Sequence, residues 1–484
     1  MALSGALSSA LSGLRAAGRG AEVVSANISN ALTPGYARRE LSLSSSVIGD
    51  YGGVRINGIQ RITDAGLASD KRLADAELNN ITEIVKFFDT AESLIGAPGD
   101  LSSLSSRLSG FESALITASS RPDAPERLLI AAAAGRDLVA KIGEASDGIQ
   151  DARSSADQAI DDYVDQLNNA LEEVQNLNYR ITAGFSQGED SATLLDQRQQ
   201  VIDRISAFVP VKQVPRDNGQ IALYTTGGAI IIDGTPAIFG FQKSNTVTAY
   251  QSVSNNTLSG LTLNGTAIRT DAERSPIRGG SLGAQFAIRD EHAVEAQAQL
   301  DALSRDLIER FQDPNVDPSL TIGDAGLFTD ASGAFNSVNE IGISSRIRLN
   351  ASVDPDQGGE AWRIRDGVNA LAPENVGNAS ILQNLSDTLS KARVPASGSF
   401  GGSAHSVSQL ISTFTSEIGV QRTSAEQKQS YASARFTELT ERQLADGVDT
   451  DAEIQRLLLI EQSYAANARM IKTVDELLDM LTRI

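Results

Sequence analysis

The 484-residue sequence contains no cysteine, only two histidines and one tryptophan, and aromatic residues make up only 5% of it. The absence of cysteine excludes disulfides, thiolate metal sites and cysteine nucleophiles. It also suits a chain that is exported unfolded or that works outside the cell, where thiols would oxidise. With so few bulky side chains, we expect thin seams between helices rather than one large globular core.

An excess of basic charge and long apolar runs are also missing. The formal net charge of −20 argues against nucleic acid or an anionic membrane as a partner, because both require a basic surface. No apolar run approaches the ~20 residues that cross a bilayer, so no membrane insertion is expected. The first twenty residues lack the charged segment and apolar stretch of a secretory signal, so any export is expected to proceed without a cleaved signal peptide. Their Ser- and Ala-rich amphipathic pattern, free of acids before Glu22, leaves a transit peptide as an alternative.

Both ends of the chain carry residues at alternating spacings of four and three, which place them on one face of a helix. These are Leu3, Leu7, Ala10, Leu14, Ala17, Ala21, Val24 and Ile28 at one end, and Leu457, Ile460, Tyr464, Asn467, Ile471, Val474, Leu478 and Leu481 at the other. Asn467 is the one polar amide in its stripe, and a buried Asn of this kind can fix register. Neither stripe can be buried alone, so we expect the N- and C-terminal helices to pair as a coiled coil.

The segments between the two ends alternate in character. Helical spacing runs over residues 67–95, 101–118, 125–181, 282–311 and about 405–445. The turn Pro98-Gly99-Asp100 separates the first two helices, with Asp100 as the expected N-cap of the second. In residues 208–280, abundant Val, Ile, Thr and Gly with turn signals at Asp217-Asn218-Gly219, Gly227-Gly228 and Asn264-Gly265 predict β-hairpins.

These patterns predict a mainly α fold with inserted β modules, in which a long helical-bundle rod carries one or two small β-rich outer domains. We expect a terminal helical axial domain from residues 1–62 and 445–484. A helical rod domain would combine residues 63–207 with 282–311 and 376–444. Residues 208–281 would form a β module, and residues 312–375 a second β or irregular outer module.

No group of residues has the pattern of a catalytic or metal site. His292 lies in a helical pattern and His405 in a Gly/Ser-rich linker, so neither pairs with a nucleophile. The Gly-rich segment 279–283 opens a helix but lacks the Lys of a phosphate-binding loop. The acids Asp313, Asp317 and Asp324 lie in a Pro-rich loop without the spacing of a calcium-binding EF-hand. We therefore expect no enzyme activity, no cofactor and no metal.

The first helix ends in a segment with a recognisable pattern, Asn27-Ile28-Ser29-Asn30-Ala31-Leu32-Thr33-Pro34-Gly35-Tyr36. Its residues also suit an ordinary helix exit, since Asn30 can cap the helix and Pro34-Gly35 reverses the chain. The segment resembles the N-terminal signature shared by bacterial flagellar rod, hook and hook-associated proteins, in which Asn-Ile-x-Asn leads into Thr-Pro-Gly-Tyr. Residues 27, 28, 30 and 33–36 match that signature.

Three further segments narrow the resemblance to the hook–filament junction family, that of hook-associated protein 1. Residues 53–64 look like the family's strand before the first rod helix, and Leu194-Leu195-Asp196-Gln197-Arg198 resembles its mid-chain helix motif. Residues 447–478 are similar to its C-terminal helix. Ile460-Glu461 departs from the aromatic residue and Gln that are common there, which slightly alters the seam.

The resemblance implies an extracellular structural component of the bacterial flagellum that connects hook to filament by polymerising through its terminal helices. It implies as partners further copies in a ring, the hook protein, a second hook–filament junction protein, an export chaperone and the type III export apparatus. Subunit packing is then expected to use Leu3, Leu7, Leu14, Val24, Asn27, Ile28, Asn30, Pro34, Gly35, Tyr36, Leu457, Ile460, Tyr464, Asn467, Ile471, Val474, Leu478 and Leu481. The alternatives are another axial protein (hook, rod or second junction protein), an extracellular enzyme on a coiled-coil stalk, and an organellar coiled-coil protein.

Overall fold

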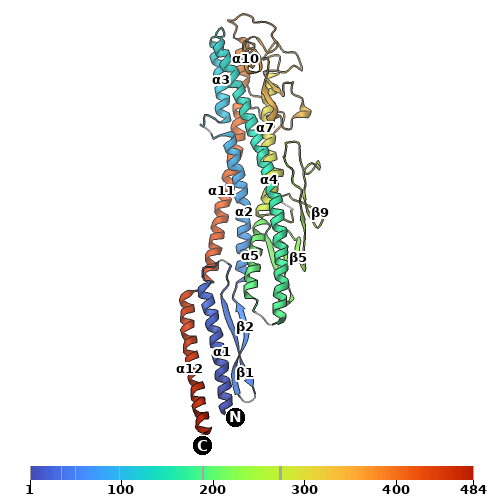
Figure 1. The fold of residues 1–484 in the computed structure, drawn as a ribbon. Helices are drawn as coiled ribbons and strands as arrows, with labels where there is room; N and C mark the ends of the chain where they lie inside the picture. Colours follow the sequence, from blue (N-terminus) through green and yellow to red (C-terminus); the bar gives the residue numbers. More distant parts are fainter. Residues whose placement is uncertain are drawn as a thin grey trace.

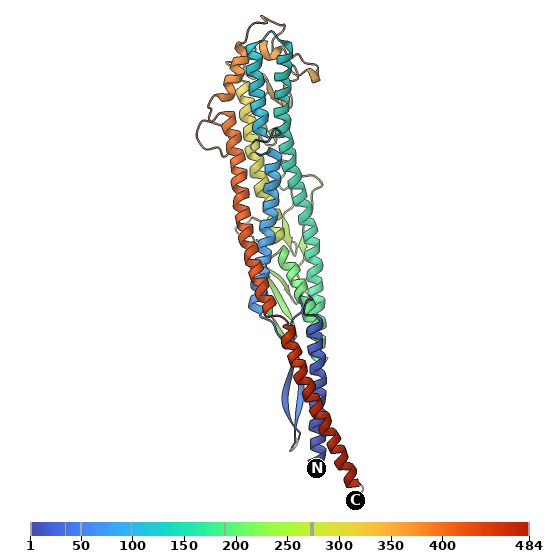
Figure 2. The same cartoon turned by 90° about the vertical axis from the view of Figure 1, so that its left-hand side faces the viewer.

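The protein is a long, narrow molecule with both chain ends at the same tip (Figures 1 and 2). The computed structural model describes residues 2–33, 35–48, 51–97, 99–187, 190–271 and 275–482. The lower part contains helix α1 (Ala2–Ser29), the hairpin of β1 (Arg39–Ile48) and β2 (Tyr51–Arg61), and helix α12 (Thr450–Thr482). The hairpin was only half predicted, because the family resemblance indicated a strand before the first rod helix but not its partner β1.

The upper part is a helical bundle of α2 (Ala65–Ile95), α3 (Leu104–Ser120), α4 (Pro125–Gln187), α5 (Ala192–Phe208), α6 (Gly280–Ala287), α7 (Ala293–Phe311), α10 (Ser380–Ser390) and α11 (Val407–Ala445). At 1.5 Å per residue, the 63 residues of α4 give a rod of about 95 Å. Side chains cap several of these helices. The Asp64 carboxylate accepts from the Leu67 N–H, and Ser406 forms a capping box with Gln409. A fully buried cluster of Phe111, Phe311 and Phe328 fills the upper bundle.

The structure differs from the expected start of the second rod helix. Helix α3 begins at Leu104 with Ser103 as its N-cap, and Asp100 instead accepts from the Ser102 N–H in the preceding turn. Leu101, expected in the helical seam, is 87% exposed. The expectation was wrong because Ser103 can cap the helix equally well, and the apolar spacing continues through a turn that is not helical.

The β module packs on the lower half of α4 and on α5. One sheet has the strand order β3 (Val211–Pro215), β4 (Ile221–Thr225), β5 (Ile230–Asp233) and β6 (Thr235–Pro236), and a second joins β7 (Phe239–Gly240), β8 (Leu261–Leu263) and β9 (Thr266–Ile268). The three predicted turns, at Asp217–Gly219, Gly227–Gly228 and Asn264–Gly265, join β3 to β4, β4 to β5 and β8 to β9, respectively. Asn218 and Asn264 adopt positive φ angles of 54° and 51°, which Asn tolerates in tight turns.

The second outer segment, residues 312–375, is mostly irregular and lies at the upper tip (Figure 1). It holds the two-stranded pair β10 (Phe328–Asp330) and β11 (Ile347–Leu349), with the short helices α8 (Ile343–Arg346) and α9 (Arg363–Asp366). In this segment, buried carboxylates accept hydrogen bonds from backbone N–H groups that a regular β-sheet would pair with carbonyls. Asp317 accepts from the Val368 N–H at 2.8 Å, and Asp301 accepts from the Gly342 N–H at 2.7 Å. The predicted fold class, mainly α with small β modules, is confirmed.

A π-helical segment, Ile288–His292, separates α6 from α7 and was not predicted. The Arg289 side chain lies between α4 and the β module. Its Nη1 donates to Asp157 on α4 at 2.6 Å, and its Nη2 donates to the Ser259 carbonyl of the β module at 3.0 Å. Arg153 adds bonds from α4 to the carbonyls of Thr248 and Gln251, each at 2.9 Å. These two arginines therefore fasten the loop of residues 240–260 to the rod.

His292 predicts a specific pH dependence of stability. It packs against Phe87 and Phe88 of α2, and burial lowers the pKa of His292 below its usual 6.5, against the opposing effect of Glu291 and Glu295. The unfolded chain then binds a proton that the folded chain resists, so the free energy of unfolding should be constant above pH 6.5 and fall as the pH drops below it. Denaturant unfolding between pH 7.5 and 5 measures this loss.

The variant His292→Phe should remove that loss, since it deletes the titrating group and keeps an aromatic ring against Phe88. His405→Gln is the matched control, because the chain has only two histidines. An equal loss of stability in wild type and His292→Phe would contradict the assignment.

Candidate assembly interface

Helices α1 and α12 run antiparallel and approach closely at two glycines. A Cβ added at Gly13 would lie 2.8 Å from the side-chain amide of Asn467, and one added at Gly20 would lie 3.2 Å from Ile460 Cδ1. Both pairs are seven residues apart on each helix, so they mark one line of contact between two helices of equal pitch. The small residues of α1 thus let α12 lie directly against the α1 backbone.

The predicted stripe on α12 divides into two rows. Ile460, Asn467 and Val474 follow each other at heptad spacing on the α1 side, where Val474 is buried and the other two are half-buried. The second row is Leu457, Tyr464, Ile471 and Leu478. In this row Leu457 and Ile471 are half-buried, but Tyr464 and Leu478 are 46% and 40% exposed, and the nearby Leu481 is exposed too. The folded chain therefore covers one row and leaves much of the other open.

The predicted stripe on α1 divides in the same way. Ala10, Ala17 and Val24 are buried, whereas Leu3, Leu7, Leu14 and Ile28 are half-buried. The β1–β2 hairpin covers α1 on another side, where the Val54 N–H donates to the Ser12 hydroxyl at 3.1 Å. Helical spacing places the half-buried rows of α1 and α12 on the same side of the pair, away from the hairpin. Together these rows form an apolar surface that we call the open face.

One turn of α12, Leu457–Ile460, is apolar around its whole circumference. Leu457, Leu458, Leu459 and Ile460 are consecutive, so they point in four directions around the helix. Ile460 lies against α1 and Leu457 is half-buried, whereas Leu458 and Leu459 are exposed. A helix that is apolar all round is normally surrounded by other helices. Among the described residues of one chain, α1 is the one helix shown beside this run.

The turn after α1 is held by Asn27, which is completely buried. Its Nδ2 donates to the Arg39 carbonyl at 2.9 Å, while its Oδ1 accepts from the Arg39 N–H at 3.0 Å and from the Tyr36 hydroxyl at 2.9 Å. Asn30 Nδ2 donates to the Ala26 carbonyl at 2.9 Å and so caps the helix end. Burial raises the pKa of Tyr36. Pro34 lies outside the described residues, and Gly35 has a φ of 78° that favours glycine.

The same turn is bonded to the rod through Asp196 on α5. Arg39 Nη2 donates to its Oδ2 at 3.0 Å and Arg61 Nε to its Oδ1 at 2.6 Å, with the Arg39 guanidinium 4.8 Å from the centre of the Tyr36 ring. A Cβ added at Gly35 would lie 2.8 Å from the Gln200 side chain, also on α5. We call Asp196, Arg39 and Arg61 the joint. They connect the terminal region to the rod.

A second set of charges ties α12 to the hairpin. Glu40 of β1 accepts from Arg38 at 2.9 Å and from Arg456 of α12 at 3.1 Å. The hydrogen bond from Arg456 holds the pKa of the Glu40 carboxyl below its usual value. Glu453, although only 3% exposed, lies 3.8 Å from Arg38 and 4.0 Å from Arg456.

None of these charged residues was among the predicted site residues. The sequence signal that could have found one of them is the Leu194–Arg198 motif, which contains Asp196. Its last residue, Arg198, donates to Asn178 on α4 and to the Gly219 carbonyl, both at 2.7 Å. The motif therefore bonds to the terminal region through Asp196 and to α4 and the β3–β4 turn through Arg198. Burial, followed by the neighbouring Arg61 charge, lowers the pKa of Arg198 to about 10.

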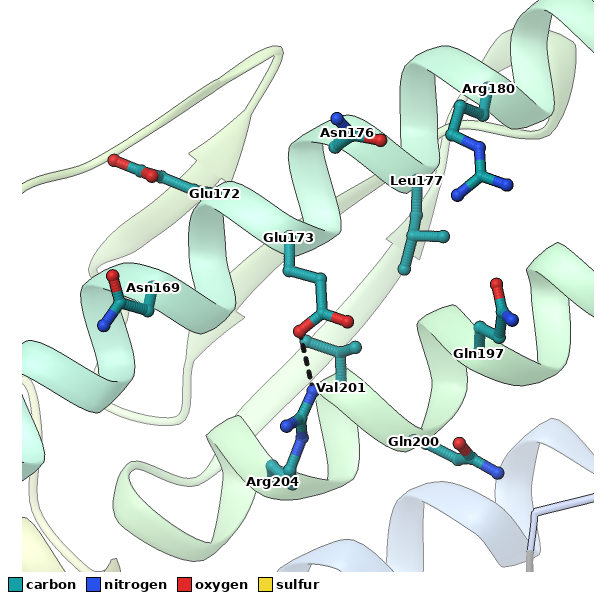
Figure 3. A pocket seen from close by; sticks show the side chains of 10 residues that line it. All are labelled: Asn169, Glu172, Glu173, Asn176, Leu177, Arg180, Gln197, Gln200, Val201 and Arg204. Carbon is teal, nitrogen blue, oxygen red and sulfur yellow. Dashed lines mark hydrogen bonds and ion pairs between the residues drawn. The ribbon is translucent and has the colours of Figure 1, made fainter.

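An open groove of about 820 Å³ lies between α4 and α5, just above the joint (Figure 3). Its lining is polar and includes Arg180, Asn176 and Gln197, with Arg204 donating to Glu173 across it at 2.7 Å. Within the described ranges no group of three or more His, Cys, Asp or Glu side chains could hold a metal ion. His292 and His405 lie in the upper bundle, far along the chain from this groove. The groove therefore offers polar contacts and no nucleophile with a base.

Two family models of flagellar proteins match parts of this chain. The family model described as the flagellar hook-associated protein FlgK helical domain matches residues 88–316, and the flagellar basal body rod FlgEFG protein C-terminal model matches residues 445–484. Flagellar hook-associated protein 1 of Escherichia coli (strain K12) is 22% identical over 100% of both chains. The chain belongs to the FlgK family.

Other similar proteins extend the comparison. Flagellar hook-associated protein 1 of Bacillus subtilis (strain 168) is 23% identical over 94% of this chain and 92% of its own. The Salmonella typhimurium protein of the same name is 30% identical over 49% of this chain and 44% of its own. The solved flagellar hook junction protein FlgK from Burkholderia pseudomallei has 17% identity and a TM-score of 0.45, covering 56% of this chain and 49% of that one.

Membership of the FlgK family makes this chain a structural protein of the flagellar hook junction, associated with other axial components of the flagellum. The FlgK family is not a family of enzymes. No described helix is both long and apolar enough to cross a membrane.

Proposed function

We propose that this FlgK-family chain connects hook to filament by polymerising through α1 and α12, whose open faces pack against those of neighbouring copies. The observation that carries the proposal is that α1 covers only one of the two apolar rows of α12. Ile460, Asn467 and Val474 are covered by α1, while Tyr464 and Leu478 of the adjacent row remain exposed. Of the subunit-packing residues expected from the sequence, those of the two helix stripes would act here, whereas Asn27, Asn30, Gly35 and Tyr36 would act by shaping the turn after α1.

Free energy favours covering this surface. Burying apolar area stabilises by about 25 cal/mol per Å², and contiguous apolar patches on monomers are rare unless something binds them. The two-helix arrangement below the joint has little core of its own, so its helices gain order mainly from neighbours. Polymerisation would supply those neighbours on every side of the Leu457–Ile460 run.

The wider assignments follow from this role. We infer further copies in a ring, the hook protein and a second hook–filament junction protein as partners, and neither nucleic acid nor membrane. We also infer delivery to the extracellular flagellum by the type III export apparatus with a chaperone, without a cleaved signal peptide. The chain would need no cofactor and would have no enzyme activity. We keep the proposed division into an axial domain (1–62 and 445–484), a rod domain (63–207, 282–311 and 376–444), a β module (208–281) and an outer module (312–375).

The rival assignment as a hook or rod protein has less support. The model that matches residues 445–484 describes the C-terminus of flagellar rod proteins. This match therefore does not separate a hook-associated protein from a hook or rod protein. The FlgK helical-domain match covers α3, α4, α5 and the β module, which lie outside that shared tail.

Removing residues 1–30 tests the proposal. Cells that depend on the truncated chain should make hooks without filaments and lose flagellin to the medium, because the apolar partner of α12 is gone. The purified truncated chain should keep the thermal unfolding transition of its rod. Retained filament attachment would disprove polymerisation through these helices.

A gentler variant separates assembly from folding. Tyr464→Ser with Leu478→Ser should also abolish filament attachment, although both side chains are exposed in the single chain. Leu129→Ser with Ile130→Ser removes apolar residues of similar exposure on α4 and is the matched control, for which attachment should persist.

A further inference from the structure

The outer module at the upper tip of the rod carries two almost fully exposed aliphatic side chains (Figure 1). These are Ile322 and Leu371, which are 97% and 98% exposed. The module packs where α4 begins, since Arg365 Nη1 donates to the Pro122 carbonyl at 3.1 Å. Asn178 of α4 bonds to the α5 motif that supplies the joint, so the tip lies roughly 80 Å from the joint at 1.5 Å per residue. The two side chains are therefore remote from the open face.

Both side chains lie on turns whose backbone is held in place. Ile322 is at the corner of the turn Thr321–Asp324, which a backbone hydrogen bond of 3.0 Å closes between its end residues. The Asp324 carboxylate also accepts from the first N–H of that turn at 2.7 Å. Leu371 directly follows the turn Gly367–Ala370, which is closed in the same way at 3.1 Å.

The two turns are also bonded to each other. The Asn369 N–H donates to the Ser319 hydroxyl, and Asn369 Nδ2 donates to Asp324 Oδ2, both at 3.1 Å. We call residues 319–324 and 367–371 the turn pair. An apolar side chain on a backbone that is already fixed loses little conformational freedom when it binds, so Ile322 and Leu371 suit the role of anchors in a contact.

The chain around the turn pair is acidic. Residues 312–345 and 366–390 contain eight acids and no lysine or arginine. Arg363, which lies just before the second of these segments, donates to the Val368 carbonyl at 2.8 Å. Charges across a contact are normally complementary, so apolar anchors with an acidic rim fit apolar pockets rimmed by lysine or arginine. A second copy of this chain would bring up the same acidic tip, and like charges disfavour that contact.

We propose that the turn pair docks on a subunit of a different axial protein, at a basic surface with pockets for Ile322 and Leu371. The proposal rests on the proposed ring, in which copies joined through their terminal helices hold their tips side by side. The tips then lie roughly 80 Å along the rod from the joint, where the adjoining tier of the tube supplies the partner. The turn pair is thus the surface by which this chain recognises a subunit unlike itself.

Photocrosslinking tests the partner directly, because the natural chain has no cysteine to compete for a thiol-reactive label. Full-length Ile322→Cys, labelled with benzophenone maleimide and illuminated in isolated hook–filament junctions, should become linked to a different axial protein. Mass spectrometry should place the link in a peptide that contains or adjoins lysine or arginine. Ile130→Cys is the matched control, because Ile130 is exposed at the same end of the rod but lies on α4, and it should give no such link.

Three outcomes would overturn the docking. These are links between copies of this chain alone, no link from Ile322→Cys in junctions that still carry filaments, and an equal yield of links from the Ile130→Cys control. The first would show that the tips meet one another, the second that the turn pair faces solvent, and the third that the whole end of the rod is merely crowded.

A double substitution gives a second readout. Ile322→Ser with Leu371→Ser should lower the fraction of hooks that carry filaments by about tenfold, because both anchors are lost. The purified variant should keep the thermal unfolding transition of the wild type, since both side chains are exposed. Leu129→Ser with Ile130→Ser again serves as the control. Undiminished attachment of the first variant would contradict the docking alone, whereas failure of polymerisation would appear as retained attachment by the chain that lacks residues 1–30.

Discussion

Replacing Asp196 with alanine should release the terminal region from the rod, at a cost of about 3–5 kcal/mol, the usual penalty for removing one partner of a buried ion pair. The Asp196 carboxylate is 9% exposed and accepts from both Arg39 and Arg61, which are themselves mostly buried. Without it, both guanidinium groups lose their carboxylate partner, and Arg39 keeps the Thr193 hydroxyl as an acceptor at 3.2 Å. Hydrogen exchange of the β1 and β2 amides should speed up, while exchange in α3 and α4 stays unchanged.

An exposed ion pair between α4 and α5 provides the control. Glu173 and Arg204 are joined at 2.7 Å, but half or more of each side chain is open to solvent. Such pairs contribute little to stability, so Glu173→Ala should leave exchange in the hairpin as it is in the wild type. If Asp196→Ala and Glu173→Ala behave alike, the joint does not hold the terminal region in place.

Arg289→Ala should destabilise the β module by about 3–5 kcal/mol, because it leaves the Asp157 carboxylate buried without its partner. Both side chains are fully buried, at 0% exposure, and the Arg289 guanidinium also lies 5.1 Å from the centre of the Phe286 ring. The loss should appear as a lower denaturant midpoint and as fast proteolysis within residues 240–260, which the guanidinium holds through the Ser259 carbonyl.

Arg269→Ala is the matched control for this prediction. Arg269 also pairs with an aspartate of the β module, Asp271, but the two side chains are 63% and 45% exposed. We expect no measurable change in its denaturant midpoint. A midpoint for Arg289→Ala within error of that control would mean that the buried pair contributes nothing to holding the module.

Regular spacing explains which parts of the fold were predictable. The stripes of α1 and α12 repeat every seven residues, and the rod helices and the hairpin turns around Asn218 and Asn264 carry equally local signals. Leu101 shows the limit of the method. An apolar residue at the right spacing was assigned to a helix that starts three residues later.

The joint could not be read from spacing, because its members are distant in sequence. Arg39 and Asp196 are 157 residues apart, and neither is unusual in its own segment. The family resemblance pointed to the Leu194–Arg198 motif without showing what Asp196 binds. The π-helical segment was missed for a related reason, since its five residues have ordinary helix propensities and the buried pair with Asp157 is a tertiary contact.

The division of the α12 stripe also needed three dimensions. A sequence pattern of alternating fours and threes shows which residues share a face but does not say which of two rows the partner helix covers. Gly13 and Gly20 decide this, because their small size lets α12 approach along the row of Ile460 and Asn467. Tyr464 and Leu478 are consequently left exposed.

Electron cryomicroscopy of the isolated hook–filament junction is the most direct test of assembly through the terminal helices. The account predicts that α1 and α12 of this chain line the axial tube, with Tyr464 and Leu478 buried against helices of neighbouring copies. A density map in which copies touch only through the rod or the β module, with these two side chains facing solvent, would contradict it.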